Sequence, residues 1–445
     1  MPRPSHRSTR RTPRRPVRIA LLALLLAAVG PATALGPVAP LAVQAPPDRP
    51  AGPVDPGAGA GTGTGAGAGT GTRTATDGDT ATGAGAVGTN PGTPTPTGRT
   101  TDVPSTVPAA ASLRLAGRRI VYSYPGDTPP PELLDTIRAG RAAGVILFKE
   151  NAPSPEQLRV AVEMLKSAAQ ESPSGAPLLL MTDQEGGKVR RLPGAPVHSA
   201  RQTGVAADPA GDAARSGAGA AGTLADAGLN VNLAPVLDVF DAPDNFIDHF
   251  ERSYSGKPEV VAELGTAFLA AQQQAGVAAT AKHFPGLGAA AREENTDERP
   301  VVLPVPLAEL RARGEEPYRA AIAGGVRLVM ASWAVYPALD ADRPAGLSSA
   351  VVQGELRRRL GFRGVTVTDA LEAGALAAFG DTGDRAVAAA GAGMDLLLCS
   401  ARDIQQGDAA AAALATALDS GRLDAGEFRS AVGRVDTLRT SFNRS

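Results

Sequence analysis

The sequence predicts a (β/α)8 barrel of the α/β class, preceded by a signal peptide and a disordered linker. After Leu113, eight short apolar runs alternate with stretches rich in Ala, Leu and Arg that have helical character. Near-continuous apolar strands indicate a parallel sheet that is buried on both faces. Strands that alternate with helices indicate α/β architecture, and eight such units fit the length of a barrel domain.

The first 45 residues have the layout of a secretory signal peptide. Five arginines between positions 10 and 18 form a basic region, and the apolar stretch Ile19–Val29 follows. Small residues then lead to candidate cleavage sites at Ala34 and Ala45. The apolar stretch is short for a membrane span, which needs about 20 residues. We therefore expect a secreted or cell-wall-associated protein, with an uncleaved membrane anchor as the alternative.

Residues 46–112 are expected to form a disordered linker. From Pro46 to about Ser105 the chain consists mostly of Gly, Ala, Thr and Pro, with few large apolar side chains. Such a composition cannot bury enough surface to offset the entropy that is lost on ordering. The folded domain is therefore expected at residues 113–445.

Charge and cysteine content exclude several classes of protein. The formal net charge is −1 at pH 7, which provides no electrostatic case for binding nucleic acid. Cys399 is the only cysteine, so no intrachain disulfide can form. The four histidines show no His-x-x-His or similar spacing of the kind that zinc sites use. We expect a monomer that needs no metal and no cofactor.

Each of the eight candidate strands is separated from the next by enough chain for a helix. They are Ile120–Tyr124, Val145–Lys149, Leu178–Asp183, Val231–Asp238, Ala278–His283, Leu328–Trp333, Val365–Asp369 and Met394–Cys399. A doubly wound open sheet is the alternative architecture. It is disfavoured because no strand leads into the Gly-x-Gly-x-x-Gly turn that dinucleotide sites use.

Charged residues end several of these apolar runs. They are Lys149, Asp183, Asp238, Lys282 with His283, and Asp369. A lone Asp after a strand is more often a helix N-cap than a catalyst. In a barrel, however, the carboxyl ends of all strands meet on the face where active sites are built. Several charged residues at such ends therefore favour an active site.

Three stretches at these strand ends have the composition of a sugar site. Thr182–Arg191 holds two acids, two glycines and three basic residues, and Asp183 can accept hydrogen bonds from adjacent sugar hydroxyls. Lys282–Gly288 continues in an irregular loop of the kind that carries function. In Val367–Glu372, Asp369 suits the nucleophile, because glycosidases need two acids that flank the scissile bond. The alternatives are a solvated turn for the first stretch and a structural histidine for the second.

These stretches resemble glycoside hydrolase family 3, in particular its single-domain β-N-acetylhexosaminidases. The similarity extends, in the same order, through Gly144–Phe148, Asp183–Leu192, Ala234–Val239, Glu251–Tyr254, Lys282–Gly288, Tyr336–Asp340 and Gly361–Leu371. It covers nearly all of residues 113–400. Members of this family fold as (β/α)8 barrels, in agreement with the strand count.

The resemblance implies roles for the matching residues. Asp369 matches the nucleophile that forms a glycosyl-enzyme intermediate. The residues that match sugar contacts are Asp183, Arg191, Arg252, Lys282 and His283. The family reaction retains the anomeric configuration and needs no metal.

The loop after Lys282–Gly288 departs from the family pattern. The hexosaminidases usually carry Asp-Ser-His there, and its histidine is the general acid and base. This chain has Asn295-Thr296-Asp297 instead, and we expect Asp297 to take the place of the histidine. The alternatives on the same loop are Glu293, Glu294 and Glu298. Trp333 also stands where many relatives have a histidine.

The sequence therefore predicts a retaining glycoside hydrolase that cleaves terminal β-linked N-acetylhexosamine from glycans or muropeptides in cell-wall turnover. One alternative is a catalytically weak barrel that binds wall glycan. The missing histidine favours it, but such a barrel would not need all of the acids and bases named here. A family 3 β-glucosidase is the other alternative. It is disfavoured because the chain ends about 45 residues after the last strand, without a second domain.

Overall fold

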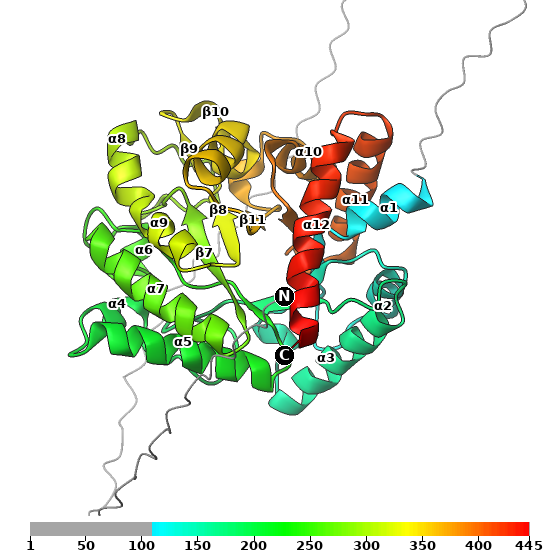
Figure 1. Ribbon diagram of the computed structural model, residues 1–445, viewed down its shortest axis with the longest axis horizontal. Coiled ribbons are helices and arrows are strands. Elements are labelled where there is room, and N and C mark those ends of the chain that lie inside the picture. Colours follow the sequence, from blue (N-terminus) through cyan, green and yellow to red (C-terminus); the bar gives the residue numbers. More distant parts are fainter. Residues whose placement is uncertain (1–108, 445) are drawn as a thin grey trace, which may run out of the picture. The chain divides into compact units, whose positions relative to one another are not determined.

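Eight parallel strands form a closed barrel in the computed structural model, which describes residues 109–444 (Figure 1). The strands are β1 (Ile120–Tyr122), β2 (Gly144–Ile146), β3 (Leu179–Thr182), β6 (Val231–Asn232), β7 (Ala278–Phe284), β8 (Leu328–Ala331), β11 (Val365–Ala370) and β12 (Leu396–Leu398). Each strand overlaps one of the eight apolar runs of the sequence. The predicted (β/α)8 barrel is confirmed.

Each barrel strand pairs in parallel with its neighbours in chain order, and β12 closes the barrel against β1. Val121 of β1, for example, lies beside Leu398 on one side and Gly144 on the other. The carboxyl ends of all eight strands therefore point to one end of the barrel. Two hairpins follow β3 and β8 at that end. They are β4 (Gln184–Gly186) with β5 (Val189–Arg190), and β9 (Val335–Tyr336) with β10 (Asp340–Pro344).

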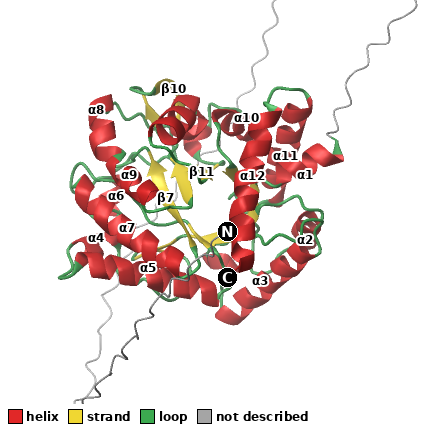
Figure 2. Ribbon diagram, viewed as in Figure 1, coloured by secondary structure: helices red, strands yellow, loops and turns green. Residues whose placement is uncertain are grey.

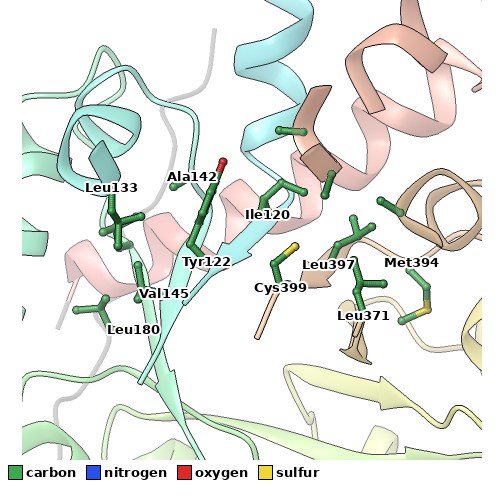
Figure 3. Packing of buried hydrophobic residues seen from close by; sticks show 14 of the residues in the cluster. Ile120, Tyr122, Leu133, Ala142, Val145, Leu180, Leu371, Met394, Leu397 and Cys399 are labelled. Atoms are coloured by element: carbon green, nitrogen blue, oxygen red, sulfur yellow. The ribbon is translucent and has the colours of Figure 1, made fainter. Parts of the chain in front are cut away.

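The side chains of the strands alternate between two buried layers. Val121 belongs to the cluster that contains Val367 and other side chains of the barrel strands, whereas its neighbours Ile120 and Tyr122 pack in the cluster shared with helices. Figure 3 shows part of the second layer, where Ile120 lies close to Leu397 of the paired strand β12. Burial of both faces is the reason that these strands read as continuous apolar runs.

Helices surround the barrel (Figure 2). They are α1 (Ala110–Gly117), α2 (Pro131–Arg138), α3 (Pro155–Gln170), α4 (Ala200–Gly204), α5 (Pro209–Asp226), α6 (Phe246–His249), α7 (Pro258–Gln274), α8 (Leu307–Glu309), α9 (Glu316–Ala323), α10 (Thr382–Ala392), α11 (Ile404–Asp419) and α12 (Ala425–Ser441). Between β8 and β11 the chain forms a π-helical segment, Ala350–Arg359. None of these helices is long and apolar enough to cross a membrane.

Sequence signals set the starts of the long helices. Proline is the first residue of α2, α3, α5 and α7, where its missing N–H costs no hydrogen bond. The side chain of Asp208 accepts the N–H of Gly211 at the start of α5, and Asp403 and Asp424 cap α11 and α12 in the same way. These aspartates are helix caps, and none of them is a predicted site residue.

The folded domain begins slightly earlier than the sequence predicts. The N–H of Ala109 donates to Asp419 at the end of α11 (3.0 Å), and the hydroxyl of Ser112 donates to the same carboxylate. Residues 110–112, which we expected in the linker, therefore belong to helix α1. The predicted signal peptide, 1–45, and the predicted linker up to residue 108 lie outside the described residues.

Candidate active site

A cavity of about 310 Å³ opens at the carboxyl ends of the barrel strands. The seven residues that the sequence predicts for the site all line it: Asp183, Arg191, Arg252, Lys282, His283, Asp297 and Asp369. Lys149 follows β2 at the same end, but it is exposed and does not line the cavity. It begins a short 3-10 helix, Lys149–Asn151.

Lys282 is buried between two carboxylates of the segment that follows β3. Its ammonium group donates to Asp183 Oδ1 at 2.7 Å and lies 2.7 Å from Glu185 Oε1. Burial alone would lower the pKa of Lys282, but the two carboxylates outweigh burial and raise it. Lys282 is therefore charged at neutral pH, and it joins the end of β7 to the end of β3.

Glu185 also binds Arg252 through a bidentate pair. Arg252 Nε donates to Oε2 at 2.9 Å, and Arg252 Nη2 donates to Oε1 at 2.8 Å. Burial alone would raise the pKa of Glu185, but Arg252 and Lys282 hold that pKa well below its ordinary value. Glu185 had no predicted role, although it lies within the acidic stretch that we expected to bind sugar. Its contacts make it the residue that holds both cations in place.

Asp238, at the end of the β6 region, fixes the ring of His283. Asp238 Oδ2 lies 2.7 Å from His283 Nδ1, and Asp238 Oδ1 accepts the N–H of Leu287 at 2.7 Å. On the other side of the ring, Nε2 lies 3.4 Å from Arg252 Nη2, which can only donate. Nε2 can accept this hydrogen bond when Nδ1 carries a proton next to Asp238. Asp238 positions His283 and is itself fully buried.

Arg191 keeps donors available toward the cavity. Its backbone N–H donates to the carbonyl of Asp183 at 3.1 Å, and its Nε lies 3.8 Å from Asp183 Oδ2. In the described part of the chain this Nε is buried without a hydrogen-bond partner. The Arg191 side chain as a whole is partly exposed, and it lines the cavity.

Asp369 lies near the end of β11, and its Oδ1 accepts the N–H of Ala370 at 2.8 Å. The indole N–H of Trp333 donates to the carbonyl of Ala370 at 2.8 Å. Trp333 is buried, and it thereby holds the strand end that carries Asp369. Among residues 109–444, no Lys, Arg or His forms an ion pair with Asp369.

Asp297 belongs to the long loop between β7 and α8. The residue as a whole is exposed at the edge of the cavity. Partial burial of its carboxyl group and the charge of nearby Asp369 raise the pKa of Asp297 to about 6, while Arg252 opposes the shift. The two carboxyl groups thus lie close enough that ionisation of one disfavours ionisation of the other.

The three alternative acids on this loop do not line the cavity. Glu294 Oε2 accepts the N–H of Ala291 at 2.7 Å, and Glu298 Oε1 accepts the side-chain amide of Asn295 at 3.0 Å. Glu293 is exposed. The geometry therefore favours Asp297 over Glu293, Glu294 and Glu298.

The cavity is also lined by residues without a predicted role. Glu372 lies three residues after Asp369, where it accepts the hydroxyl of Ser400 at 2.6 Å. The guanidinium group of Arg402 lies 4.3 Å from the ring centroid of Phe148. Glu372 lies in Val367–Glu372, one of the three stretches that the sequence predicts for the sugar site. Ser400 and Arg402 follow β12, and no sequence pattern pointed to them. Within the described chain, no cluster of three or more His, Cys, Asp and Glu side chains is arranged to hold a metal ion.

Residues 127–438 match the family model for the N-terminal domain of glycosyl hydrolase family 3. The chain belongs to this family. It is therefore a glycosyl hydrolase, as the sequence predicts, and its relatives include β-hexosaminidases.

Two curated relatives illustrate the range of the family. An uncharacterized secreted glycosyl hydrolase of Arthroderma benhamiae is 46% identical over 73% of this chain and 92% of its own length. Beta-hexosaminidase A of Pseudoalteromonas piscicida is 32% identical over 72% of this chain. The chain spans 56% of the length of that second relative.

Solved structures of family 3 enzymes have the same fold. The β-N-acetylglucosaminidase of Paenibacillus sp. str. FPU-7 aligns with a TM-score of 0.70 and 36% identity, over 74% of this chain and 63% of its own. The β-N-acetylhexosaminidase of Beutenbergia cavernae aligns with a TM-score of 0.67 and 34% identity. That match covers 74% of this chain and 98% of the Beutenbergia chain.

Proposed function

We propose that this family 3 glycosidase removes terminal β-linked N-acetylhexosamine from glycans with retention, using Asp369 as nucleophile and Asp297 as general acid and base. The observation that carries the proposal is a pair of carboxyl groups on one cavity, one of which has a pKa raised to about 6. Retaining hydrolysis of a glycosidic bond needs one group that donates a proton and one ionised nucleophile, and two carboxyl groups with different pKa values can supply both. The related β-hexosaminidases support the choice of sugar.

The two residues exchange protons in two steps. In the first, Asp369 attacks the anomeric carbon while Asp297 gives its proton to the glycosidic oxygen, and the aglycone leaves as an alcohol. In the second, ionised Asp297 takes a proton from water, and the water oxygen displaces Asp369 from the anomeric carbon. Two inversions return the β-anomer. Proton NMR of the first product formed tests this, because an inverting enzyme would release the α-anomer.

The mutual repulsion of Asp297 and Asp369 suits this order of events. In the free enzyme the negative charge of Asp369 helps to keep the proton on Asp297. Once Asp369 is an ester it carries no charge, so the pKa of Asp297 falls and the carboxylate is ready to act as a base. The same carboxyl group is thus an acid in the first step and a base in the second.

We assign the sugar at the cleaved position to the opposite side of the cavity. Its contacts are Asp183, Arg191, Arg252, Lys282 and His283. The partly exposed guanidinium group of Arg191 would donate to a sugar hydroxyl, and free lone pairs of Asp183 would accept from one. Glu185 would act only by holding the two cations.

We also propose that the protein is exported and acts on cell-wall glycans or muropeptides. The basic and apolar pattern of residues 1–45 and the secreted Arthroderma relative support export. Hydrolysis of purified peptidoglycan fragments, followed by mass spectrometry, tests the substrate. Loss of one N-acetylhexosamine from the non-reducing end is the expected result.

A panel of p-nitrophenyl glycosides tests the proposed specificity. We expect release from the N-acetyl-β-glucosaminide and not from the β-glucoside. Cleavage of the β-glucoside alone would replace the proposal with β-glucosidase activity. Binding of glycan by calorimetry without cleavage of any substrate would favour the catalytically weak barrel, for which the Asp in place of His is the motivating observation.

Substitution of Asp297 by Ala tests the acid/base role. General acid catalysis typically contributes about 10²- to 10⁴-fold, and it matters most when the leaving group is poor. Asp297→Ala should keep the first step for a dinitrophenyl glycoside and lose it for an alkyl glycoside. Added azide should then restore turnover and give the β-glycosyl azide. Equal rates on both substrates in variant and wild type would move the role to another residue.

A further inference from the structure

The segment that carries the proposed nucleophile also holds the loop that carries the proposed acid/base. A short 3-10 helix, Gly374–Leu376, begins five residues after Asp369. The N–H of Gly374 donates to the carbonyl of Asp297 at 2.8 Å, and the N–H of Ala375 donates to the carbonyl of Thr296 at 3.0 Å. Two adjacent backbone hydrogen bonds therefore join the two catalytic loops.

The middle of the acid/base loop has no other backbone anchor within the described chain. The remaining backbone–backbone hydrogen bonds of residues 291–300 stay inside the loop, such as Glu298 N–H to the carbonyl of Asn295 at 3.1 Å. The ends of the loop are fixed elsewhere. Leu287 N–H binds Asp238, and Leu303 N–H binds the carbonyl of Val335 at 2.9 Å. The position of Asp297 therefore depends on the contact with the 3-10 helix.

A side chain at position 374 would prevent this contact. A Cβ on Gly374 would lie 2.2 Å from the carbonyl oxygen of Glu298, 2.4 Å from its carbonyl carbon and 3.0 Å from the backbone nitrogen of Arg299. All three are backbone atoms, so no rotation of a side chain can make room. Gly374 is not among the glycines with positive φ, so alanine can adopt its conformation. Position 374 therefore requires glycine because there is no room for a Cβ beside the backbone of Glu298 and Arg299.

We propose that Gly374 is a positioning residue for acid/base catalysis, because its bare backbone lets the Asp297 loop dock on the loop of Asp369. This inference rests on the proposed role of Asp297. The docking sets where the proton donor lies relative to the nucleophile before any substrate binds. Gly374 touches neither the substrate nor the reacting atoms, and it acts only through Asp297.

The test is Gly374→Ala, assayed with an alkyl and a dinitrophenyl N-acetyl-β-glucosaminide. The added methyl group should push the loop away while Asp369 and the sugar contacts stay in place. We expect kcat/KM for the alkyl glycoside to fall by at least about tenfold, a part of the 10²- to 10⁴-fold that general acid catalysis supplies. For the dinitrophenyl glycoside we expect a change of less than about threefold, because that leaving group needs little protonation. Azide should partly rescue the variant.

The ratio of the two kcat/KM values is the readout. It does not depend on how much of the protein is folded, since inactive protein lowers both values equally. Gly433→Ala is the matched control, because a Cβ there would meet nothing within 4 Å, and its ratio should equal that of the wild type. If Gly374→Ala gives no active protein, Ala375→Pro gives the same readout. It removes the second donor in the first turn of a helix, where proline is tolerated.

Two results separate this inference from the proposed function. An unchanged ratio in the Gly374 or Ala375 variant, together with a selective loss in Asp297→Ala, overturns the positioning role alone. An unchanged ratio in Asp297→Ala overturns the acid/base role and the inference with it. A loss on both substrates to the same extent, in otherwise folded Gly374→Ala, also overturns it, because general damage would explain that result.

Discussion

The two sides of the cavity hold their charges in opposite ways. On the side of β3 and β7, Asp183 and Glu185 pair with Lys282, and Glu185 also pairs with Arg252. On the side of β11, Asp369 has no cation in an ion pair among the described residues, and the carboxyl group near it, that of Asp297, has a raised pKa. The first side therefore keeps its charges fixed, while the second can move a proton. In the proposed function, the first side binds the sugar and the second transfers the proton.

The cost of the two arrangements also differs. Buried ion pairs lose much of their Coulombic gain to desolvation, so the pairs around Glu185 add little net stability while they remain intact. Removing one partner is strongly destabilising, because the other charge is then buried without a counterion. On the catalytic side, repulsion between Asp297 and Asp369 works against stability, so removing one carboxylate relieves strain. Substitutions on the two sides should therefore separate activity from stability.

The largest effect is expected for Asp369→Asn. A neutral amide cannot form the glycosyl ester, so kcat should fall by several orders of magnitude. The melting temperature should be equal to or above that of the wild type, because the repulsion of Asp297 is removed. Steady-state kinetics and thermal unfolding measure the two quantities. Normal turnover by a folded variant would show that another residue is the nucleophile.

On the binding side, Glu185→Gln should affect stability as well as activity. The amide keeps the size of the side chain but leaves Arg252 and Lys282 without their shared carboxylate, which should cost about 3–5 kcal/mol of unfolding free energy. KM should rise because both cations lose their position. Glu163→Gln is the matched control: its pair with Lys166 is exposed (3.7 Å), and such pairs contribute about 0–1 kcal/mol. Equal stability of the two variants would contradict the contrast between the sides.

The contrast also shows which parts of the site the sequence could reveal. The strands and the strand-end residues Asp183, Lys282 and Asp369 follow from local patterns, because burial on both faces and parallel pairing apply to any barrel. Arg252 and Asp297 lie far from strand ends, so only resemblance to a family pointed to them.

The local sequence could not identify contacts between residues that are far apart in the chain but follow neighbouring strands of the barrel. Glu185 and Arg252 are 67 residues apart, and nothing near either residue identifies the other. The role of Trp333 depends on a hydrogen bond to a carbonyl 37 residues away. Such contacts form only when neighbouring strands pair, so the local sequence cannot reveal them.

The smallest expected effect is the dependence of kcat/KM on pH. It tests most directly whether the catalytic side of the cavity can move a proton. An Asp ordinarily has a pKa near 3.9, whereas that of Asp297 is raised to about 6. The general acid must hold its proton, so kcat/KM for an alkyl glycoside should fall about tenfold per pH unit above pH 6. Asp297→Asn should lack this decline. A decline that persists unchanged in Asp297→Asn would assign it to another group.

Stability should follow the same group with a definite sign. Between about pH 4 and 6 the folded state holds the Asp297 proton and the unfolded state has lost it, so unfolding free energy falls as pH rises through this window. Above about pH 6 Asp297 is ionised in both states, so its unfavourable contribution to the unfolding free energy no longer changes with pH. The lowered pKa of Glu185 has the opposite effect at about pH 4 to 5, where its carboxyl group still binds protons in the unfolded state only, but this contribution is common to the wild type and Asp297→Asn and cancels in their difference. Lys282 does not titrate in this range, because its pKa is raised from an already high ordinary value. Relative to the wild type, Asp297→Asn should thus gain melting temperature from pH 4 to 6. A difference in melting temperature that stays constant from about pH 4 to 6 would mean that the pKa of Asp297 is not raised in the folded protein.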